Sequence, residues 1–378
     1  MNSVPALAHI PPGIVNLNDH EVHAQSVLDA KAWAYFSGGA GDEITLRANR
    51  SSWDNLSLQP RVLQPLAGGH LRSTLLGRSL ALPILVAPVA YQRIAHPDGE
   101  LAMAYAAAAQ NTGFVLSTQS SIAMETIATA VVNEPGRGPL WFQLYMQHDR
   151  GFTDELVQRA ELAGFEALVV TVDAPSNGVR DRERRVGFKV PPGISAVNLA
   201  GMPPAPIVRT GSDSLFQGVA AQAPTWDDLA RLQSRTRLPI LLKGILHEDD
   251  ARQAAAMGFA GVIVSNHGGR TLDTAPATSV MLPRIADAVA AYSNQSVGRT
   301  AILVDGGIRR GTDVLKAIAL GAQAVLVGRP CVFGLANAGA VGVAHVLRLL
   351  RDELEIAMAQ CGCATLAQVT PQLLLKTC

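Results

Sequence analysis

The sequence predicts a (β/α)8 barrel, the TIM barrel, and three observations indicate it. Short runs rich in Val, Ile and Leu alternate with longer stretches that have helical patterns. About eight such runs occur, and continuous apolar strands are typical of a parallel sheet covered on both faces. Several helical stretches end at glycine, as helices often do. A doubly wound open sheet is the alternative that the same alternation allows.

The predicted elements follow the chain in a regular order. The strands are expected at 82–90, 114–118, 140–146, 167–173, 239–245, 261–267, 301–306 and 324–329. Helices between them are expected, for example, at 98–112, 153–163, 248–257 and 312–320. Each of these four helices is followed by a glycine at the expected C′ position, namely Gly113, Gly164, Gly258 and Gly321.

Two segments interrupt the alternation within a single domain that we expect to span residues 1–378. Residues 1–80 precede the first barrel strand, contain a helix at about 24–36, and are expected to cover the bottom or flank of the barrel. Residues 175–223 follow the fourth strand and are too long for an ordinary βα loop. This insertion begins with charged residues and is then nearly free of charge, which favours an active-site lid.

The composition excludes several classes of protein. Lys+Arg and Asp+Glu are both 31 in 378 residues, so the charge balance offers no electrostatic footprint for nucleic acid. The four cysteines do not form a disulfide framework or a Cys-x-x-Cys motif, which favours reduced thiols in the cytoplasm. No signal peptide is evident, and no apolar run is expected to reach the roughly 18 residues of a membrane-spanning helix.

The segment Ser265–Thr271 carries the strongest chemical signal. It follows a buried strand, so it lies at the end of that strand where barrel enzymes place their sites. His267 and Arg270 lie three residues apart on this loop. Arginine can bind a carboxylate through two hydrogen bonds, and histidine can take a proton from the atom beside it. A glycine-rich turn with a surface arginine is the simpler alternative.

Polar side chains also occur at the ends of the other predicted strands. They are Ser117, Thr118, Gln119, Gln143, Tyr145, Thr171, Asp173, Lys243, Asp305 and Arg329. Because the strand ends of a barrel meet at one face, these residues predict a site that is lined from all sides. A salt-bridged barrel interior is the alternative.

The last two strands are followed by glycine- and arginine-rich turns. Asp305–Gly311 and Gly328–Pro330 each lead from a strand into a helix. Glycines allow a close backbone approach, and helix N-termini and arginines favour a phosphate. These loops are the usual phosphate site of the barrel fold, so they predict a phosphorylated ligand.

With these residues in place, the chain resembles the FMN-dependent L-2-hydroxy acid oxidases and dehydrogenases, which include glycolate oxidase, lactate oxidase and mandelate dehydrogenase. The resemblance runs from about Ala34 to about Cys361 and is most specific at Ser265–Arg270 followed by Leu272-Asp273. The supporting matches are Ala95–Pro97, Phe142–Tyr145, Thr171–Asp173, Lys243-Gly244 and Asp305–Gly307.

The resemblance implies a role for each matching residue around a 2-hydroxy acid. His267 would be the base that takes a proton while hydride passes from the substrate's α-carbon to flavin N5. Asp173 would stabilise the imidazolium. Arg270 and Arg180 would bind the substrate carboxylate. The resemblance also implies that Tyr35 bonds that carboxylate and that Tyr145 contacts the substrate hydroxyl.

The resemblance further implies that FMN is the cofactor and that no metal is needed. Lys243 would lie near flavin N1 and O2 and stabilise negative charge there. The isoalloxazine would be lined by Pro88, Val89, Ala90, Ser117, Gln143, Tyr145, Thr171 and Ser265. The turns after the last two strands would hold the phosphate through Asp305, Gly306, Gly307, Arg309, Gly328 and Arg329. The other histidines, His148 among them, are expected to be structural or at the surface.

Two positions and the electron acceptor leave the reaction partly open. Gln119 stands where glycolate oxidase has tryptophan, and Tyr91 stands where it has methionine, so glycolate cannot be assumed. Ala90 stands where oxidases have alanine and mandelate dehydrogenase has glycine. We therefore expect a cytoplasmic oxidase that uses oxygen, produces hydrogen peroxide, and forms a homotetramer. The alternatives are a quinone-linked dehydrogenase that binds the membrane peripherally through 193–223, and a non-redox isomerase.

Overall fold

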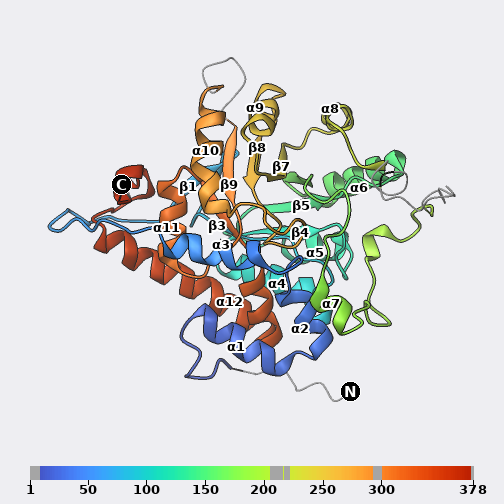
Figure 1. Ribbon diagram of the computed structural model, residues 1–378, viewed down its shortest axis with the longest axis horizontal. Coiled ribbons are helices and arrows are strands. Elements are labelled where there is room, and N and C mark those ends of the chain that lie inside the picture. The colour runs from blue at the N-terminus through green and yellow to red at the C-terminus, as the bar shows by residue number, and fades with distance from the viewer. Residues whose placement is uncertain (1–8, 205–215, 217–221, 293–299, 376–378) are drawn as a thin grey trace.

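The computed structural model describes residues 9–204, 216, 222–292 and 300–375. These residues form a closed barrel of eight parallel strands in the order β10-β3-β4-β5-β6-β7-β8-β9, surrounded by helices (Figure 1). The closed barrel confirms the predicted fold class and excludes the open sheet, because β10 pairs with β3 through Val325 and Ile84.

The barrel strands are short and lie within the predicted runs, except that one begins a residue early, at Gly113. They are β3 (Ile84–Val86), β4 (Gly113–Ser117), β5 (Leu140–Leu144), β6 (Ala167–Thr171), β7 (Ile240–Ile245), β8 (Gly261–Val264), β9 (Ala301–Val304) and β10 (Ala324–Val327). The helices between and after them are α4 (Gly99–Ala109), α5 (Met124–Val131), α6 (Arg150–Ala163), α7 (Asp181–Arg185), α8 (Trp226–Gln233), α9 (Glu248–Ala256), α10 (Thr278–Ala290), α11 (Gly311–Ala319) and α12 (Arg329–Gln360).

Glycine ends three of the four helices as predicted, and the fourth expectation is wrong. Gly164, Gly258 and Gly321 have φ of 90°, 78° and 106°, the left-handed conformation that suits glycine after a helix. Helix α4 instead ends at Ala109. Asn111 takes the left-handed conformation there, and Gly113 is the first residue of β4.

The N-terminal extension begins with two helices where the sequence predicted one at 24–36. These are α1 (Leu17–Val27) and α2 (Ala30–Ser37). Leu28 is extended, and the Asp29 carboxylate accepts hydrogen bonds from the backbone N–H groups of Lys31 and Ala32. An aspartate in this position starts a new helix, which is the signal that the prediction missed.

A hairpin of β1 (Ser73–Leu75) and β2 (Arg78–Leu80) closes one end of the barrel. Leu75 and Leu80 are buried in the same apolar cluster as interior strand residues such as Trp141 and Leu303. Arg78 pairs with Glu166, which immediately precedes β6, at 2.8 Å. The hairpin therefore covers the bottom of the barrel, as expected for part of residues 1–80.

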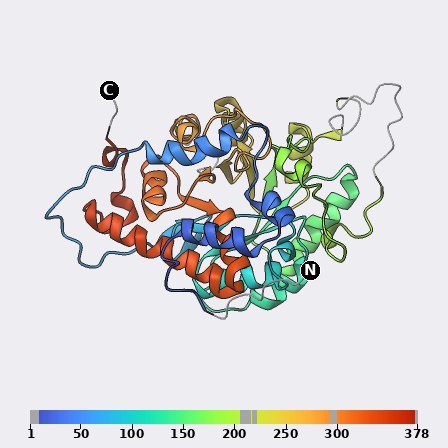
Figure 2. The same ribbon diagram turned by 60° about the horizontal axis from the view of Figure 1, so that its bottom comes forward.

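The rest of the N-terminal extension reaches beyond the bottom and flank of the barrel. This corrects the expectation that residues 1–80 would cover only those parts. Helix α1 lies along α12, side by side in both views (Figures 1 and 2). Helix α3 (Ile44–Asp54) reaches the loops at the opposite end of the barrel. There the amides of Asn49 and Asn266 exchange hydrogen bonds of 2.8 and 2.7 Å, and Trp53 donates to the Gly306 carbonyl. The extension thus supports the loops that follow β8 and β9.

The long C-terminal helix corrects the expectation that no apolar run could cross a membrane. Among the described residues, α12 is the one helix that is long and apolar enough, with a mean hydropathy of 1.5 over its best window. Of that window, 78% is buried within the fold. Its apolar character is therefore explained by packing against α1, α4 and α11.

The lid insertion, 175–223, is described over residues 175–204, 216 and 222–223, and the remainder of this prediction lies outside the described residues. It contains α7 and a short 3-10 turn at Val197–Leu199. Two further 3-10 turns, Leu366–Gln368 and Pro371–Leu373, follow α12.

We expect Gly307→Ala to destabilise the protein. Gly307 has φ +82°, and an added Cβ would lie 2.0 Å from the Asn49 carbonyl oxygen of α3, so the helix would have to move. A residue held in such a conformation costs roughly 1–3 kcal/mol before any steric clash is counted. Thermal unfolding would measure the loss. Gly68→Ala is the control, because Gly68 has φ +78° with nothing near its added Cβ. Equal losses in the two variants would contradict the packing explanation.

Candidate active site

A cavity of about 810 Å³ opens at the ends of the barrel strands that lead into the βα loops. This volume is within the range of small-molecule and cofactor sites, roughly 300–1,000 Å³. Residues from the N-terminal extension, the strand ends and the lid line the cavity together, among them Tyr35, Ser117 and Arg180. Of the polar residues predicted at the strand ends, Thr118 and Asp173 do not line this cavity, and the others do.

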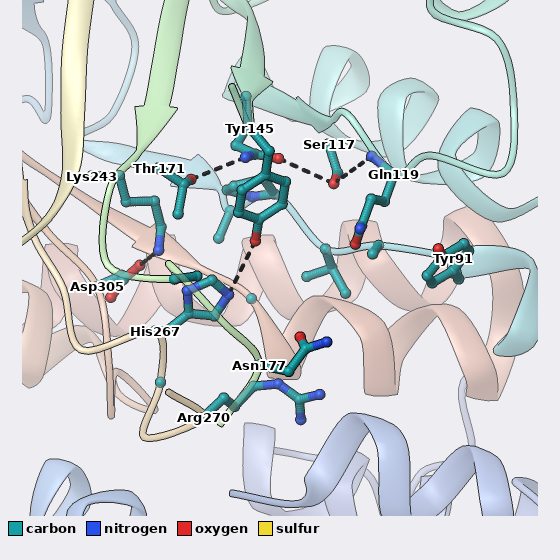
Figure 3. Close-up of a pocket in the computed structure, with 18 of the residues that line it drawn as sticks. Tyr91, Ser117, Gln119, Tyr145, Thr171, Asn177, Lys243, His267, Arg270 and Asp305 are labelled. Atoms are coloured by element: carbon teal, nitrogen blue, oxygen red, sulfur yellow. Dashed lines mark hydrogen bonds and ion pairs between the residues drawn. The ribbon is translucent and has the colours of Figure 1, made fainter. Parts of the chain in front are cut away.

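His267 lines this cavity from the loop that follows β8. Its Nδ1 lies 2.9 Å from Asp173 Oδ1, and its Nε2 lies 3.4 Å from the Tyr145 hydroxyl (Figure 3). A carboxylate can only accept, so His267 donates from Nδ1 and keeps Nε2 free of a proton. The unprotonated nitrogen therefore faces Tyr145, as a general base requires.

Backbone conformation brings His267 and Asp173 together. His267 itself has φ +57°, an uncommon conformation for a non-glycine residue. Gly244 has φ +111°, and a Cβ there would lie 2.4 Å from the Cβ of Asp173. Only glycine leaves room for Asp173 at this point of β7.

Burial and neighbouring charges set the protonation of this pair. Burial lowers the pKa of His267, Lys243 and Arg270 lower it further, and Asp173 opposes them, so the pKa falls below its ordinary 6.5. Burial raises the pKa of Asp173, but the attraction of His267 and Lys243 outweighs it, so that pKa is lowered. The resting pair is thus a neutral imidazole beside an ionised carboxylate.

Two arginines reach the same cavity from different elements. Arg270 comes from the loop after β8, and Arg180 from the residue before α7 in the lid. Arg270 Nη1 donates to the carbonyl oxygens of Tyr35 and Gly38, at 2.6 and 2.9 Å, and its guanidinium lies 5.2 Å from the Tyr35 ring centre. One imidazole and two guanidinium groups therefore line one cavity, as the sequence predicted.

Lys243 lies at the other side of the cavity and is neutralised there. Its ammonium group is 3.1 Å from Asp305 Oδ2 and donates to Ser265 Oγ at 2.9 Å (Figure 3). Burial alone would lower the pKa of Lys243, but Asp305 and Asp173 raise it overall, so it is a cation. The prediction that Ser265 would line the flavin ring is wrong, because Ser265 does not line the cavity. It lies behind Lys243, fully buried, and accepts from the His267 backbone N–H.

The remaining residues predicted to contact a flavin ring all line the cavity. They are Pro88, Val89, Ala90, Ser117, Gln143, Tyr145 and Thr171. Gln143 is fixed by two neighbours, because it donates to Thr171 Oγ1 at 3.0 Å and accepts from Ser117 Oγ at 3.2 Å. This part of the lining therefore combines fixed polar groups with apolar ones.

The predicted phosphate residues Gly306, Gly307, Arg309, Gly328 and Arg329 also line the cavity. Arg329 donates only to carbonyl oxygens, those of Phe36, Gly38 and Gly268, and within the described residues no carboxylate pairs with it. Burial lowers its pKa, and Arg270 and Arg309 lower it further. Helix α12 starts beside it with no side chain capping its first turn. An anion would satisfy both the arginine and the helix end.

The structure also shows lining residues that the sequence did not predict. Asn177, Glu183 and Phe188 come from the lid, and the Phe188 ring stacks on Tyr35 at 4.6 Å. His148 lines the cavity as well, which corrects its interpretation as a structural or surface residue. Glu183 lies one helical turn after Arg180, a spacing that could have been recognised within the charged run. Arg184 and Arg185 are 66% and 74% exposed, so that part of the run is a solvated face.

Tyr91 and Gln119 also line the cavity, across from Lys243 and Asp305 (Figure 3). The backbone N–H of Tyr91 donates to the Gln119 carbonyl at 3.1 Å, so the two positions are coupled. Tyr91 has φ +54°, a conformation that few aromatic residues adopt. The two departures from glycolate oxidase therefore lie at one place in the site.

Comparisons with known proteins agree with this geometry. Residues 24–376 match the model of the FMN-dependent dehydrogenase family. An L-lactate oxidase of Roseobacter sp. (strain GAI101) is 50% identical over 367 residues, which cover 96% of each chain. Glycolate oxidase 1 of Zea mays is 43% identical over 94% of each chain. The crystal structure of mandelate oxidase with (S)-2-phenylpropionate superposes with a TM-score of 0.84 at 41% identity, over 96% of this chain and 98% of that one.

Proposed function

Because this chain belongs to the FMN-dependent dehydrogenase family, we propose that it oxidises L-lactate, or an L-2-hydroxy acid of similar size, to the 2-oxo acid. The enzyme is an FMN-dependent 2-hydroxy acid oxidase, with oxygen as the acceptor. The proposal depends most on one observation: His267 Nε2, Arg270 and Arg180 all face one cavity. A base beside a carboxylate clamp suits proton removal next to a carboxylate.

In the proposed reaction, FMN when bound supplies the acceptor for the two electrons that leave the substrate. Arg270 and Arg180 bind the carboxylate and Tyr35 adds a hydrogen bond, which places the hydroxyl-bearing carbon between them and His267. His267 Nε2 takes the hydroxyl proton, and Tyr145 orients that hydroxyl. Asp173, at 2.9 Å, stabilises the imidazolium that results.

The chain's own residues fit FMN at both ends of the cavity. Arg329, a buried cation with only carbonyl partners, and the uncapped start of α12 suit a phosphate. Arg309 would contribute there too, beside Gly307 and Gly328. Lys243 and Gln143 offer donors to the polar edge of the ring. Asp305 Oδ1 is buried without a partner among the described residues, so this region has unmet hydrogen-bonding capacity.

An anaerobic titration tests this function. Purified holoenzyme should be yellow, lose its colour when an L-2-hydroxy acid is added without air, and regain it within seconds once oxygen enters. Glycolate, L-lactate, longer aliphatic acids, mandelate and the D-enantiomers should be compared. Protein that takes up no FMN would refute the function. Slow recovery with oxygen but fast recovery with a quinone analogue would instead support a dehydrogenase.

Relatives named L-lactate oxidase support lactate, at 50% and 47% identity. Gln119 and Tyr91 support a pocket that differs from that of glycolate oxidase. The proposed ranking is therefore L-lactate first, with glycolate and mandelate slower.

The activity should depend on pH through His267. Its pKa is lowered, chiefly by burial, so the neutral base persists through neutral pH. We expect kcat/KM to be flat above the ordinary histidine range and to fall only at lower pH. Asp173→Asn removes the charge that raises this pKa. The acid limb should move to still lower pH, since one nearby charge shifts a pKa by about 1–3 units. The rate should fall at least about tenfold, because a less basic imidazole is a weaker proton acceptor. A limb that moves to higher pH would contradict the assignment.

We further propose a cytoplasmic location and an oligomer, in line with the family resemblance. Cys331, Cys361 and Cys363 are free, buried thiols, which supports a reducing compartment. Light scattering of the purified holoenzyme would measure its mass.

A further inference from the structure

A carboxylate of the lid contacts both arginines of the proposed carboxylate clamp. Glu183 Oε1 lies 3.0 Å from Arg270 Nη2 and 3.5 Å from Arg180 Nη1. The three side chains are only 15%, 14% and 19% exposed, and all three line the same cavity. The site therefore contains an acidic group of its own beside the place where the substrate's acid would bind.

The other contacts of the two guanidinium groups do not change this charge balance. Arg270 Nη1 donates to the Tyr35 and Gly38 carbonyls, which are neutral. Arg180 Nε is buried and has no partner among the described residues. Burial lowers the pKa of Arg270, Arg180 lowers it further, and Glu183 acts in the opposite direction. Two positive charges thus share one negative charge, which leaves a net charge of one for a ligand.

We propose that Glu183 sets this net charge and thereby makes the enzyme select 2-hydroxy acids with one carboxylate over those with two. The inference rests on the proposed function, in which Arg180 and Arg270 bind the substrate carboxylate. One substrate carboxylate brings the clamp to neutrality. A second carboxylate would add negative charge beside Glu183 with no cation left to balance it, and a like charge at such a distance in a buried site is strongly unfavourable.

Among the described residues, the lysine and the other arginines that line the cavity already have partners or an assigned role. Lys243 is paired with Asp305 at 3.1 Å, and Arg309 lies 3.5 Å from Glu21. The polar side chain beside Arg270 in Figure 3, Asn177, is uncharged. Arg329 is assigned to the cofactor phosphate. Glu183 is therefore the group through which the site distinguishes one negative charge from two.

Another residue of α7 attaches this helix to the N-terminal extension, so Glu183 is not needed for that structural role. Arg182 Nη2 lies 2.5 Å from Glu43 Oε2, and Arg182 Nη1 donates to Ser37 Oγ at 3.3 Å. These contacts hold α7 against the N-terminal extension without Glu183. An isosteric change at Glu183 should therefore alter the charge of the site and leave the lid attached.

The test compares two anions of nearly equal size, oxamate with one negative charge and oxalate with two. Each is titrated into the oxidised holoenzyme, and binding is followed by calorimetry and by the flavin absorbance. In Glu183→Gln, the affinity for oxalate relative to oxamate should rise about tenfold or more, since one unit charge within a few ångströms is removed. Glu183→Asp keeps the charge and should keep the selectivity of the wild type.

Asp181→Asn is the matched control on the same helix. Asp181 lies outside the cavity, 36% exposed, and pairs with Arg184. It should leave the oxalate-to-oxamate ratio unchanged. If Glu183→Gln changes both affinities by the same factor, or leaves both unchanged, the inference is overturned while the clamp stands. If neither anion binds the wild-type holoenzyme, the clamp itself is refuted, and the proposed function fails with it.

Discussion

Replacing His267 with alanine is expected to leave FMN bound and to lower kcat by about 10²–10⁴, the contribution of a positioned general base. The loss follows from geometry, because Nε2 faces the cavity while Nδ1 is held by Asp173 at 2.9 Å. Among the described residues of the site, no other group has this arrangement: burial raises the pKa of Tyr145, so its hydroxyl stays protonated. Stopped-flow reduction under anaerobic conditions would measure the step directly.

The control for His267→Ala is His247→Ala. His247 is largely exposed and contacts Asp249 at the start of α9, away from the cavity. It should retain wild-type turnover. FMN content from the absorbance spectrum separates loss of the base from loss of the cofactor. Full activity in His267→Ala would refute the role of this residue.

Replacing Arg270 with lysine is expected to raise KM and lower kcat together, with a fall in kcat/KM of about 10- to 100-fold. A hydrogen bond to a charged group contributes about 1.5–3 kcal/mol, which corresponds to this range. Arg270 uses Nη1 for the Tyr35 and Gly38 carbonyls and Nη2 for Glu183. A lysine has one nitrogen, so it cannot hold these partners and a substrate carboxylate in one plane.

Arg182→Lys is the matched control for Arg270→Lys. Arg182 also pairs with a glutamate, Glu43, at 2.5 Å, but it does not line the cavity. Steady-state kinetics over a range of L-lactate should show little change in this variant. A similar loss in both variants would indicate that Arg270 acts through the stability of the lid and not through the substrate.

Much of the fold could be predicted because the barrel strands are locally encoded. The run Val262–Val264 is apolar at every position and is fully buried, as a strand covered on both faces requires. The break between α1 and α2 was missed because Leu28 and Asp29 differ from helical residues only in backbone conformation and capping. Chain-local patterns predict periodicity better than they predict where one helix ends and the next begins.

The candidate site, too, could be predicted from the sequence only in part. His267 and Arg270 could be found because three residues separate them on one loop, and a family resemblance assigned their roles. Ser265 was misplaced because its residue type does not tell whether the side chain faces the cavity or lies behind Lys243. His148 was missed because it reaches the cavity from a segment whose path through space the sequence does not specify. Glu183 was missed because its spacing from Arg180 within the charged run was not recognised.

The amino-acid sequence alone determined the barrel, the order of its strands, and the residue types that meet at its open end, because each short, continuous apolar run predicts a strand buried on both faces. Only the tertiary structure decided that α3 supports the loops after β8 and β9, and that Glu183 shares its charge between two arginines. Those contacts join residues far apart in the chain, such as Asn49 and Asn266, and they exist only after the barrel has closed and the lid has folded over it.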